Sequence, residues 1–399
     1  MNSFPRRPSS ALLLLLGSLT LLIGACGDDN QSGGGAQGGS GGADGTGGDL
    51  AGGGVVGGSG GAEPVDPLEA AVRENDWVKL DGAPSVGGGA KQDDIFFVNG
   101  STGFVASGPN EAIFSTEDAG ETWQEVFNSP GTYFRAVLFT SEQHGFAGNI
   151  GSGLAPSISD DTLVYETLDG GATWEPVTTI TGSPAKGICN FSAADEDNIF
   201  GIGRANGPAH LLQSSDGGAT WVAKSLTSTF SMAIDGRFTS ATEGLVIGMG
   251  SSGQKCTIAK TTDGGDSFET VFTSDTSGSL CWKMHFSSDL IGYVAVQDTT
   301  SGPGTIAKTT DGGDTWTELP LPVDGDPYGG IGIGFISDNI GWVASEDPAA
   351  PVFRTFDGGA TWEEDPALKA PINRFRFIDE NTAYAVGGSV WKLDLSGGQ

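Results

Sequence analysis

The chain has 399 residues, of which 67 are glycine, and it carries 19 lysines and arginines against 50 aspartates and glutamates, a formal net charge of −31 at pH 7. This acidity excludes nucleic acid as a default partner, because phosphate binding requires a basic surface. It also argues against broad adhesion to anionic membranes.

Residues 1–25 have the pattern of a targeting segment. Arg6 and Arg7 precede an apolar run of 13 residues, from Ala11 to Ile23, which is too short to span a bilayer. The following Gly-Ala-Cys resembles the lipobox of bacterial lipoproteins, so we expect Cys26 to be lipidated and to become the new N-terminus. An ordinary secretory signal with an incidental cysteine is the alternative. Both interpretations place the protein outside the cytoplasm, in the cell envelope, and the lipobox predicts a lipid anchor as its membrane attachment.

Residues 26–62 are expected to form a disordered tether behind that cysteine. Eighteen of the 36 residues in 27–62 are glycine. Such a composition cannot bury enough apolar surface to become ordered. A glycine-rich coil of this length has an end-to-end reach of about 30–36 Å.

From residue 63 onward the chain is organised by a repeated box. The segment KTTDGGDTW, from Lys308 to Trp316, has five close copies, and the terminal aromatics are spaced by 46–51 residues. A period of this length predicts a propeller or a solenoid. Within a box, the aspartate can accept hydrogen bonds inside a tight turn and the final aromatic can pack against the adjacent unit. The structural residues of the six boxes are Asp118, Asp169, Asp216, Asp263, Asp311 and Asp357, with Trp123, Trp174, Trp221, Phe268, Trp316 and Trp362.

A second pattern, strand–turn–strand, precedes each box and occurs once more near the C-terminus. It therefore gives seven units for six boxes. The last unit has a third strand at Val390–Leu393 but no box after it, while Trp77–Leu80 resembles the strand that follows a box. We therefore predict an all-β, seven-bladed propeller over residues 63–399, closed by the N-terminal strand joining the last blade so that no edge stays exposed.

Three cysteines follow Cys26. Cys256 and Cys281 fall on the same face of the predicted propeller, and export permits disulfides, so we expect this pair to be bridged and Cys189 to be free. The chain has no CxxC pair and its three histidines are scattered, so we predict no metal site and no cofactor.

The boxes, which follow the pattern S/T-x-D-G-G-x-T-W, resemble the Asp-box (bacterial neuraminidase) repeat. Together with elements such as Ile340–Ala344, they look most like the photosystem II stability/assembly factor type of seven-bladed propeller, over Trp77 to Leu395. In that family the propeller is a non-catalytic binding platform that helps to assemble a membrane complex through an arginine-rich patch. The resemblance implies a protein or peptide partner, and we expect a monomer.

Two groups of basic residues bear on this expectation. Lys260, Lys308 and Arg354 lead into boxes, where their stems are expected to pack along a strand. Six others lie in or just before first strands, near the predicted channel. This second group either forms one positive mouth for a carboxylate-bearing partner or neutralises neighbouring blade carboxylates. Its members are Arg135, Arg237, Lys283, His285, Arg374 and Arg376. Loops 150–161, 298–304 and 319–330 are the expected contact loops.

The competing function is a glycan-binding propeller or a sialidase-like glycoside hydrolase. A sialidase site needs three arginines for the substrate carboxylate, a Tyr–Glu pair and an aspartic acid. Arginine is scarce in this chain and no such pair stands out. We therefore assign no catalytic residue, although the separation of two carboxylates, which defines other glycosidases, is invisible in a sequence.

Overall fold

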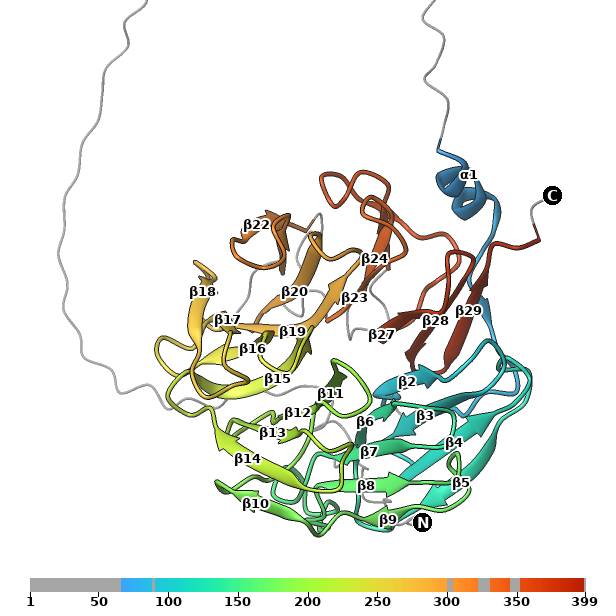
Figure 1. Cartoon of the computed structure of the whole chain (residues 1–399). Coiled ribbons are helices and arrows are strands. Elements are labelled where there is room, and N and C mark those ends of the chain that lie inside the picture. Colours follow the sequence, from blue (N-terminus) through green and yellow to red (C-terminus); the bar gives the residue numbers. More distant parts are fainter. Residues whose placement is uncertain (1–65, 88–89, 300–303, 322–330, 345–351, 398–399) are drawn as a thin grey trace, which may run out of the picture.

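The computed structural model describes residues 66–87, 90–299, 304–321, 331–344 and 352–397. The predicted targeting segment, Cys26 and the tether lie outside the described residues, as do residues 300–303 and 322–330 of two predicted contact loops. The described residues form seven sheets arranged as a wheel (Figure 1). Inner strands touch in the order β2, β6, β11, β15, β19, β23 and β27, and β27 touches β2 again. This circular order confirms the predicted all-β, seven-bladed propeller.

We number the blades in chain order and give their strands from the centre outward. Blade 1 contains β2 (Asp94–Phe97), β3 (Gly103–Ser107), β4 (Ala112–Thr116) and β5 (Gln124–Asn128). Blade 2 contains β6 (Phe134–Phe139), β7 (Gly145–Asn149), β8 (Val164–Thr167) and β9 (Glu175–Pro176). Blade 3 contains β11 (Asn190–Ala193), β12 (Ile199–Gly203), β13 (His210–Ser214) and β14 (Trp221–Ser225).

Blade 4 contains β15 (Phe230–Phe238), β16 (Gly244–Gly250), β17 (Cys256–Thr261) and β18 (Glu269–Thr273). Blade 5 contains β19 (Ser279–Phe286), β20 (Gly292–Asp298), β21 (Thr305–Thr309) and β22 (Thr317–Pro320). Blade 6 contains β23 (Gly332–Phe335), β24 (Gly341–Ala344), β25 (Phe353–Thr355) and β26 (Glu363–Glu364). Blade 7 contains β27 (Ile372–Phe377), β28 (Thr382–Gly387), β29 (Val390–Asp394) and β1 (Val78–Lys79).

The N-terminal strand closes the wheel. Strand β1 pairs antiparallel with β29, with Val78 opposite Lys392 and Lys79 opposite Trp391. The first and last strands of the described chain therefore share one sheet, which confirms the predicted closure. Joining them leaves blade 7 with the same four-stranded width as its neighbours.

Two elements were not expected from the sequence. Helix α1 (Pro67–Glu74) precedes β1; Asp66 caps it by accepting a hydrogen bond from the Leu68 amide at 2.9 Å, and Val72 is buried. A helix of two turns is too short to show a helical period. Strand β10 (Ile180–Gly182) adds to the outer edge of blade 3, parallel to β14. Among the described residues, no helix is long and apolar enough to cross a membrane.

Each box folds into the same hydrogen-bonded turn. In blade 5, Asp311 Oδ1 accepts from the Thr309 hydroxyl at 2.7 Å and from the Thr315 amide at 2.9 Å, while Oδ2 accepts from the Thr315 hydroxyl at 2.5 Å. The Trp316 indole donates to the Gly313 carbonyl at 3.1 Å. Gly313 has φ +96°, a conformation that other residues rarely adopt. Corresponding carboxylate bonds are formed by Asp118, Asp169, Asp216, Asp263 and Asp357.

The box aromatics join neighbouring blades. Trp221 of blade 3 lies edge-on to Phe146 of blade 2, at 5.5 Å between ring centroids, and Trp174 of blade 2 stacks on Phe127 of blade 1 at 6.1 Å. Blade 7 has no box, and Trp77 takes the same position. It directly precedes β1, as Trp362 precedes β26, and its ring meets Trp342 of blade 6 edge-on at 5.4 Å. The N-terminal segment thus supplies both the closing strand and the missing aromatic.

A disulfide links blades 4 and 5. It joins Cys256, at the start of β17, to Cys281 in β19, which is the pair expected from the sequence, and Cys189 is free and buried. Trp282 and Lys283 follow Cys281 directly. The bridge therefore anchors the part of β19 that faces the centre of the wheel.

Candidate functional site

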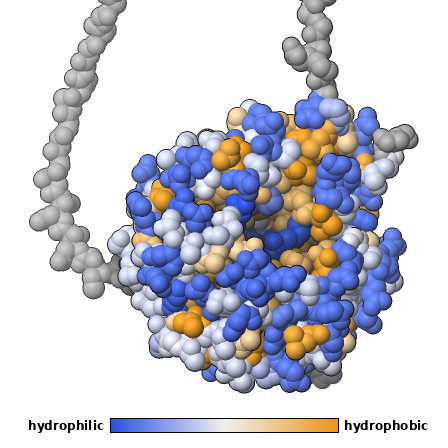
Figure 2. Space-filling view, viewed as in Figure 1, coloured by the Kyte–Doolittle hydropathy of each residue, from blue (hydrophilic) through white to orange (hydrophobic). Residues whose placement is uncertain are grey.

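The centre of the wheel is polar, although the inner strands are otherwise largely apolar. One position, three residues before the last residue of each inner strand, is polar in five blades and small in the other two, at Ala136 and Gly332. All five polar side chains are buried. Figure 2 shows the corresponding hollow, which has a hydrophilic floor. We call these five residues the channel layer: Asp94, Asn190, Asp235, Lys283 and Arg374.

Arg374 of blade 7 spans this layer. Its Nη1 lies 3.2 Å from Asp235 Oδ2 of blade 4, and its Nη2 donates to Asn190 Oδ1 of blade 3 at 2.9 Å. Its Nε lies 3.2 Å from Asp94 Oδ1 of blade 1. One guanidinium therefore connects four blades, because its planar fork presents donors in several directions.

The acceptors of this network also bind the backbone of the next blade. Asp94 Oδ2 accepts from the Val137 amide of blade 2 at 3.2 Å, and Asp235 Oδ2 accepts from the Met284 amide of blade 5 at 3.2 Å. Both carboxylates are thus held by backbone amides as well as by arginine. They are structural ties between blades at the centre of the wheel.

Charge in the channel layer is balanced between two carboxylates and two basic groups. Burial acts to raise the pKa of Asp94, but Arg376 and Arg374 outweigh it and hold that pKa below its usual value. Burial, assisted by the nearby Arg374, lowers the pKa of Lys283 to about 7. Near neutral pH the layer therefore keeps Asp94 ionised, while Lys283 holds its proton less tightly than an exposed lysine does.

A second buried group continues the layer on one side. Arg135 Nη1 pairs with Asp93 Oδ1 at 2.7 Å, and Lys91 Nζ donates to Asn373 Oδ1 at 3.1 Å. Burial raises the pKa of Asp93, although Arg135 and Lys91 oppose this shift. The ring of Trp282 lies 5.9 Å from the Arg135 guanidinium. Arg135 is therefore enclosed between a carboxylate and an aromatic ring.

Three basic residues lie nearer to solvent, one position before the end of their inner strands. They are Arg237 of β15, His285 of β19 and Arg376 of β27, and we call them the basic mouth. Arg237 and Arg376 keep 32% and 31% of their side chains exposed, whereas Arg135 and Arg374 keep 6% and 7%. This difference in exposure separates the arginines that an incoming group can reach from those that it cannot.

The two arginines of the basic mouth differ in how firmly internal partners hold them. Arg237 reaches Asp289 at 3.2 Å, but that carboxylate is 97% exposed and the pair is correspondingly weak. Arg376 is held by two bonds: its Nε donates to the Ile95 carbonyl at 3.0 Å, and its Nη2 donates to Asp94 Oδ1 at 3.1 Å. Burial, assisted by the nearby arginines, lowers the pKa of His285 to about 4, so His285 is neutral at pH 7.

The structure thus divides the six basic residues singled out in the sequence. Arg135, Lys283 and Arg374 belong to the buried centre, where Arg135 and Arg374 pair with carboxylates of other blades and Lys283 lies among them. Arg237, His285 and Arg376 form the basic mouth. Sequence reasoning missed the acceptors Asp93, Asp94, Asn190 and Asp235. Aligning the seven inner strands on their last residue would have revealed three of these four as polar residues at one position.

No protein-family model matches the sequence, and no curated protein matches it. Solved structures do match. YCF48 bound to D1 peptide has a TM-score of 0.58 and 18% identity, with 80% of this chain and 99% of that chain covered. YCF48 from Cyanidioschyzon merolae has a TM-score of 0.59 and 15% identity over 81% of this chain and 99% of that chain.

Two further similar structures are enzymes. The GH74 xyloglucanase from Xanthomonas campestris has a TM-score of 0.59 and 16% identity, covering 81% of this chain and 54% of that chain. Streptogramin B lyase has a TM-score of 0.57 and 14% identity, covering 80% of this chain and 96% of that chain. At these identities the likeness establishes the fold, which is shared by binding proteins and enzymes, so function must be argued from the site.

Proposed function

We propose that this protein is an exported, lipid-anchored binding platform whose basic mouth holds the C-terminal carboxylate of a protein or peptide partner. The supporting observation is the exposure of Arg237 and Arg376 above a floor of buried, compensated charges. Cys26 and the glycine-rich tether, as expected from the sequence, would attach this platform to a membrane of the cell envelope.

The chemistry of the mouth suits a carboxylate. Arginine binds carboxylates through two parallel charge-assisted hydrogen bonds. The Nε2 atom of His285 contacts the Phe335 carbonyl at 2.8 Å, so the proton of the neutral ring lies on Nε2 and Nδ1 is left as an acceptor. A peptide terminus brings both a carboxylate for the arginines and a backbone N–H for such an acceptor.

The strong overall acidity does not prevent this binding. At physiological ionic strength, charges beyond about 8 Å are largely screened, so the local arginines dominate at the mouth. One similar structure is YCF48 bound to a D1 peptide. That likeness is compatible with a peptide-binding propeller, while the mouth residues themselves carry the proposal for this chain.

The proposal is tested by affinity capture from detergent-solubilised envelope of the source cells. The bait is the wild-type protein, the variant Arg237→Ala/Arg376→Ala, or the charge-matched control Lys255→Ala/Lys369→Ala. We expect the mouth variant to lose partners that wild type and control retain, while a cooperative melting transition shows that the variant is folded. Capture of the same partners by all three baits would reject the proposed site.

Glycoside hydrolysis is the alternative, because a xyloglucanase shares the fold. A general acid in such a reaction needs a raised carboxyl pKa and access to substrate. In the channel layer, the pKa of Asp94 is held low and Asp235 is bound by Arg374 and by a backbone amide. We expect no turnover of fluorogenic sialosides. Turnover that Asp235→Asn abolishes would favour the enzyme.

A further inference from the structure

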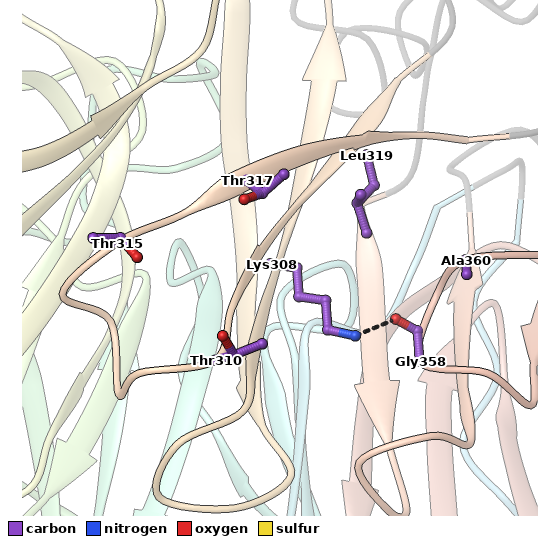
Figure 3. A pocket seen from close by; sticks show the side chains of 7 residues that line it. All are labelled: Lys308, Thr310, Thr315, Thr317, Leu319, Gly358 and Ala360. Carbon is purple, nitrogen blue, oxygen red and sulfur yellow. Dashed lines mark hydrogen bonds between the residues drawn. The ribbon is translucent and has the colours of Figure 1, made fainter.

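A groove of about 310 Å³ lies between blades 5 and 6, away from the inner strands (Figure 3). Lys308 of β21 points into it and donates to the Gly358 carbonyl of the blade 6 box at 2.8 Å. The threonines at 310, 315 and 317 and Leu319 come from blade 5, and Ala360 comes from blade 6. Hydroxyl groups, one ammonium group and two apolar side chains therefore share one opening.

The internal repeat shows why the groove is open here. Lys260, Lys308 and Arg354 all lie three residues before a box aspartate. Lys260 pairs across the sheet with Glu269, and its Nζ forms an ion pair with Asp314 of the next box at 2.5 Å. Arg354 pairs with Glu363 at 2.9 Å. Two of the three equivalent basic residues thus have an internal carboxylate.

Lys308 differs because both acidic positions have been replaced. Its cross-strand partner is Thr317 where Lys260 has Glu269. Ala360 occupies the position in its box that Asp314 occupies in the box facing Lys260. Among the described residues, Lys308 forms no ion pair, and its Nζ is engaged by the Gly358 carbonyl.

We infer that this groove binds a carboxylate-bearing saccharide, whose carboxylate meets Lys308 as the Asp314 carboxylate meets Lys260. Thr310, Thr315 and Thr317 are exposed and can bond to sugar hydroxyls. The Thr315 hydroxyl already donates to Asp311, so it accepts from the ligand. Leu319 and Ala360 offer apolar surface to the ring carbons, and the volume is that of a small-ligand pocket.

The surrounding charges select a ligand with a single negative charge. Burial lowers the pKa of Lys308, while Asp357 and Asp338 lie near enough to act in the opposite direction. Those two carboxylates would repel a phosphate, which carries nearly two charges at pH 7, more strongly than a carboxylate. The groove is separate from the basic mouth, so binding at one site can be absent while binding at the other is present.

Calorimetric titration with D-glucuronate tests the inference. D-glucose, which lacks the carboxylate, and acetate, which lacks the sugar ring, are the comparison ligands. Lys308→Met removes the ammonium group, and Ala360→Asp supplies the internal carboxylate that Lys260 already has. Lys260→Met is the matched control at the equivalent position of blade 4. Melting curves and retained capture of the peptide partner show that each variant is folded.

We expect glucuronate to bind wild type at one site and Lys260→Met with similar affinity. Binding should weaken by at least about tenfold in both Lys308→Met and Ala360→Asp, and glucose and acetate should bind wild type at least about tenfold more weakly than glucuronate. No binding of glucuronate, or binding indifferent to both groove variants, would overturn the inference. Equal affinity for acetate would overturn the saccharide assignment.

Discussion

Arg374 and Asp235 lie on opposite blades of the wheel, 139 residues apart in sequence, and meet at 3.2 Å between Nη1 and Oδ2. The contact crosses the centre of the wheel, where side chains of opposite blades tie the blades together. Arg237 and Arg376 lie above this floor. A floor of paired, buried charges under two partly exposed arginines is the arrangement from which the binding proposal follows.

Arg374→Met should destabilise the fold strongly. It leaves the buried Asp94 and Asp235 carboxylates without their shared cation, and breaking a buried ion pair on one side costs about 3–5 kcal/mol. Denaturant unfolding measures the loss. Arg237→Met, which removes an arginine that is 32% exposed, should change stability by no more than about 0.5 kcal/mol. Equal effects of the two substitutions would contradict the role of Arg374 as a tie between blades.

Trp77→Ala should destabilise the packing between blades 6 and 7, where the ring closes. Trp77 is 5% exposed and packs against Trp342 and Phe375, and truncation of a buried tryptophan costs about 3–5 kcal/mol. The adjacent Val78 is 61% exposed, so Val78→Ala should cost about 0.5 kcal/mol or less. Thermal unfolding of both variants provides the comparison. A mild effect at Trp77 would show that the ring closes without this aromatic.

Asp311→Asn should make stability less sensitive to acid. The hydroxyl of Thr315, followed by its amide, lowers the pKa of Asp311 from 3.8 to about 2. Because the folded pKa is the lower one, this stabilisation is present above about pH 4 and is lost as the pH falls towards 2. The variant should be less stable at pH 7 and lose less between pH 4 and 2. The exposed Glu175→Gln is the control, and parallel pH curves for Asp311→Asn and wild type would refute the prediction.

The paired substitution Cys256→Ser/Cys281→Ser should lower the free energy of unfolding by about 2–4 kcal/mol, because the bridge restricts the unfolded chain. Wild type treated with reductant should approach the stability of the variant. If oxidised wild type, reduced wild type and the variant unfold at the same denaturant concentration, the disulfide does not contribute to stability.

The architecture was predictable because the sequence repeats at a regular interval. Boxes spaced by 46–51 residues, one surplus strand pair and an unmatched strand at Trp77–Leu80 together specify a closed ring of seven. Helix α1 was missed because eight residues give too little periodicity, although Asp66 followed by Pro67 is a recognised start signal.

The candidate site was only partly predictable. Sequence indicates that Arg237, Arg374 and Arg376 lie near the centre, since each falls in a first strand. It does not indicate which carboxylates face them, because Arg374 finds its partners on three other blades. Whether an arginine is buried with a carboxylate or left reachable depends on the height at which its strand crosses the centre, which only the assembled wheel defines.

The most direct test of the basic mouth compares one peptide in two forms, with a free C-terminal carboxylate and with a C-terminal amide. The peptide is the C-terminal segment of a captured partner, and its Kd is measured on wild type and on Arg237→Ala/Arg376→Ala. We predict that wild type binds the acid at least about tenfold more tightly than the amide, and that this ratio falls to about one in the variant. A ratio near one on wild type, or a ratio that the variant preserves, would contradict the account.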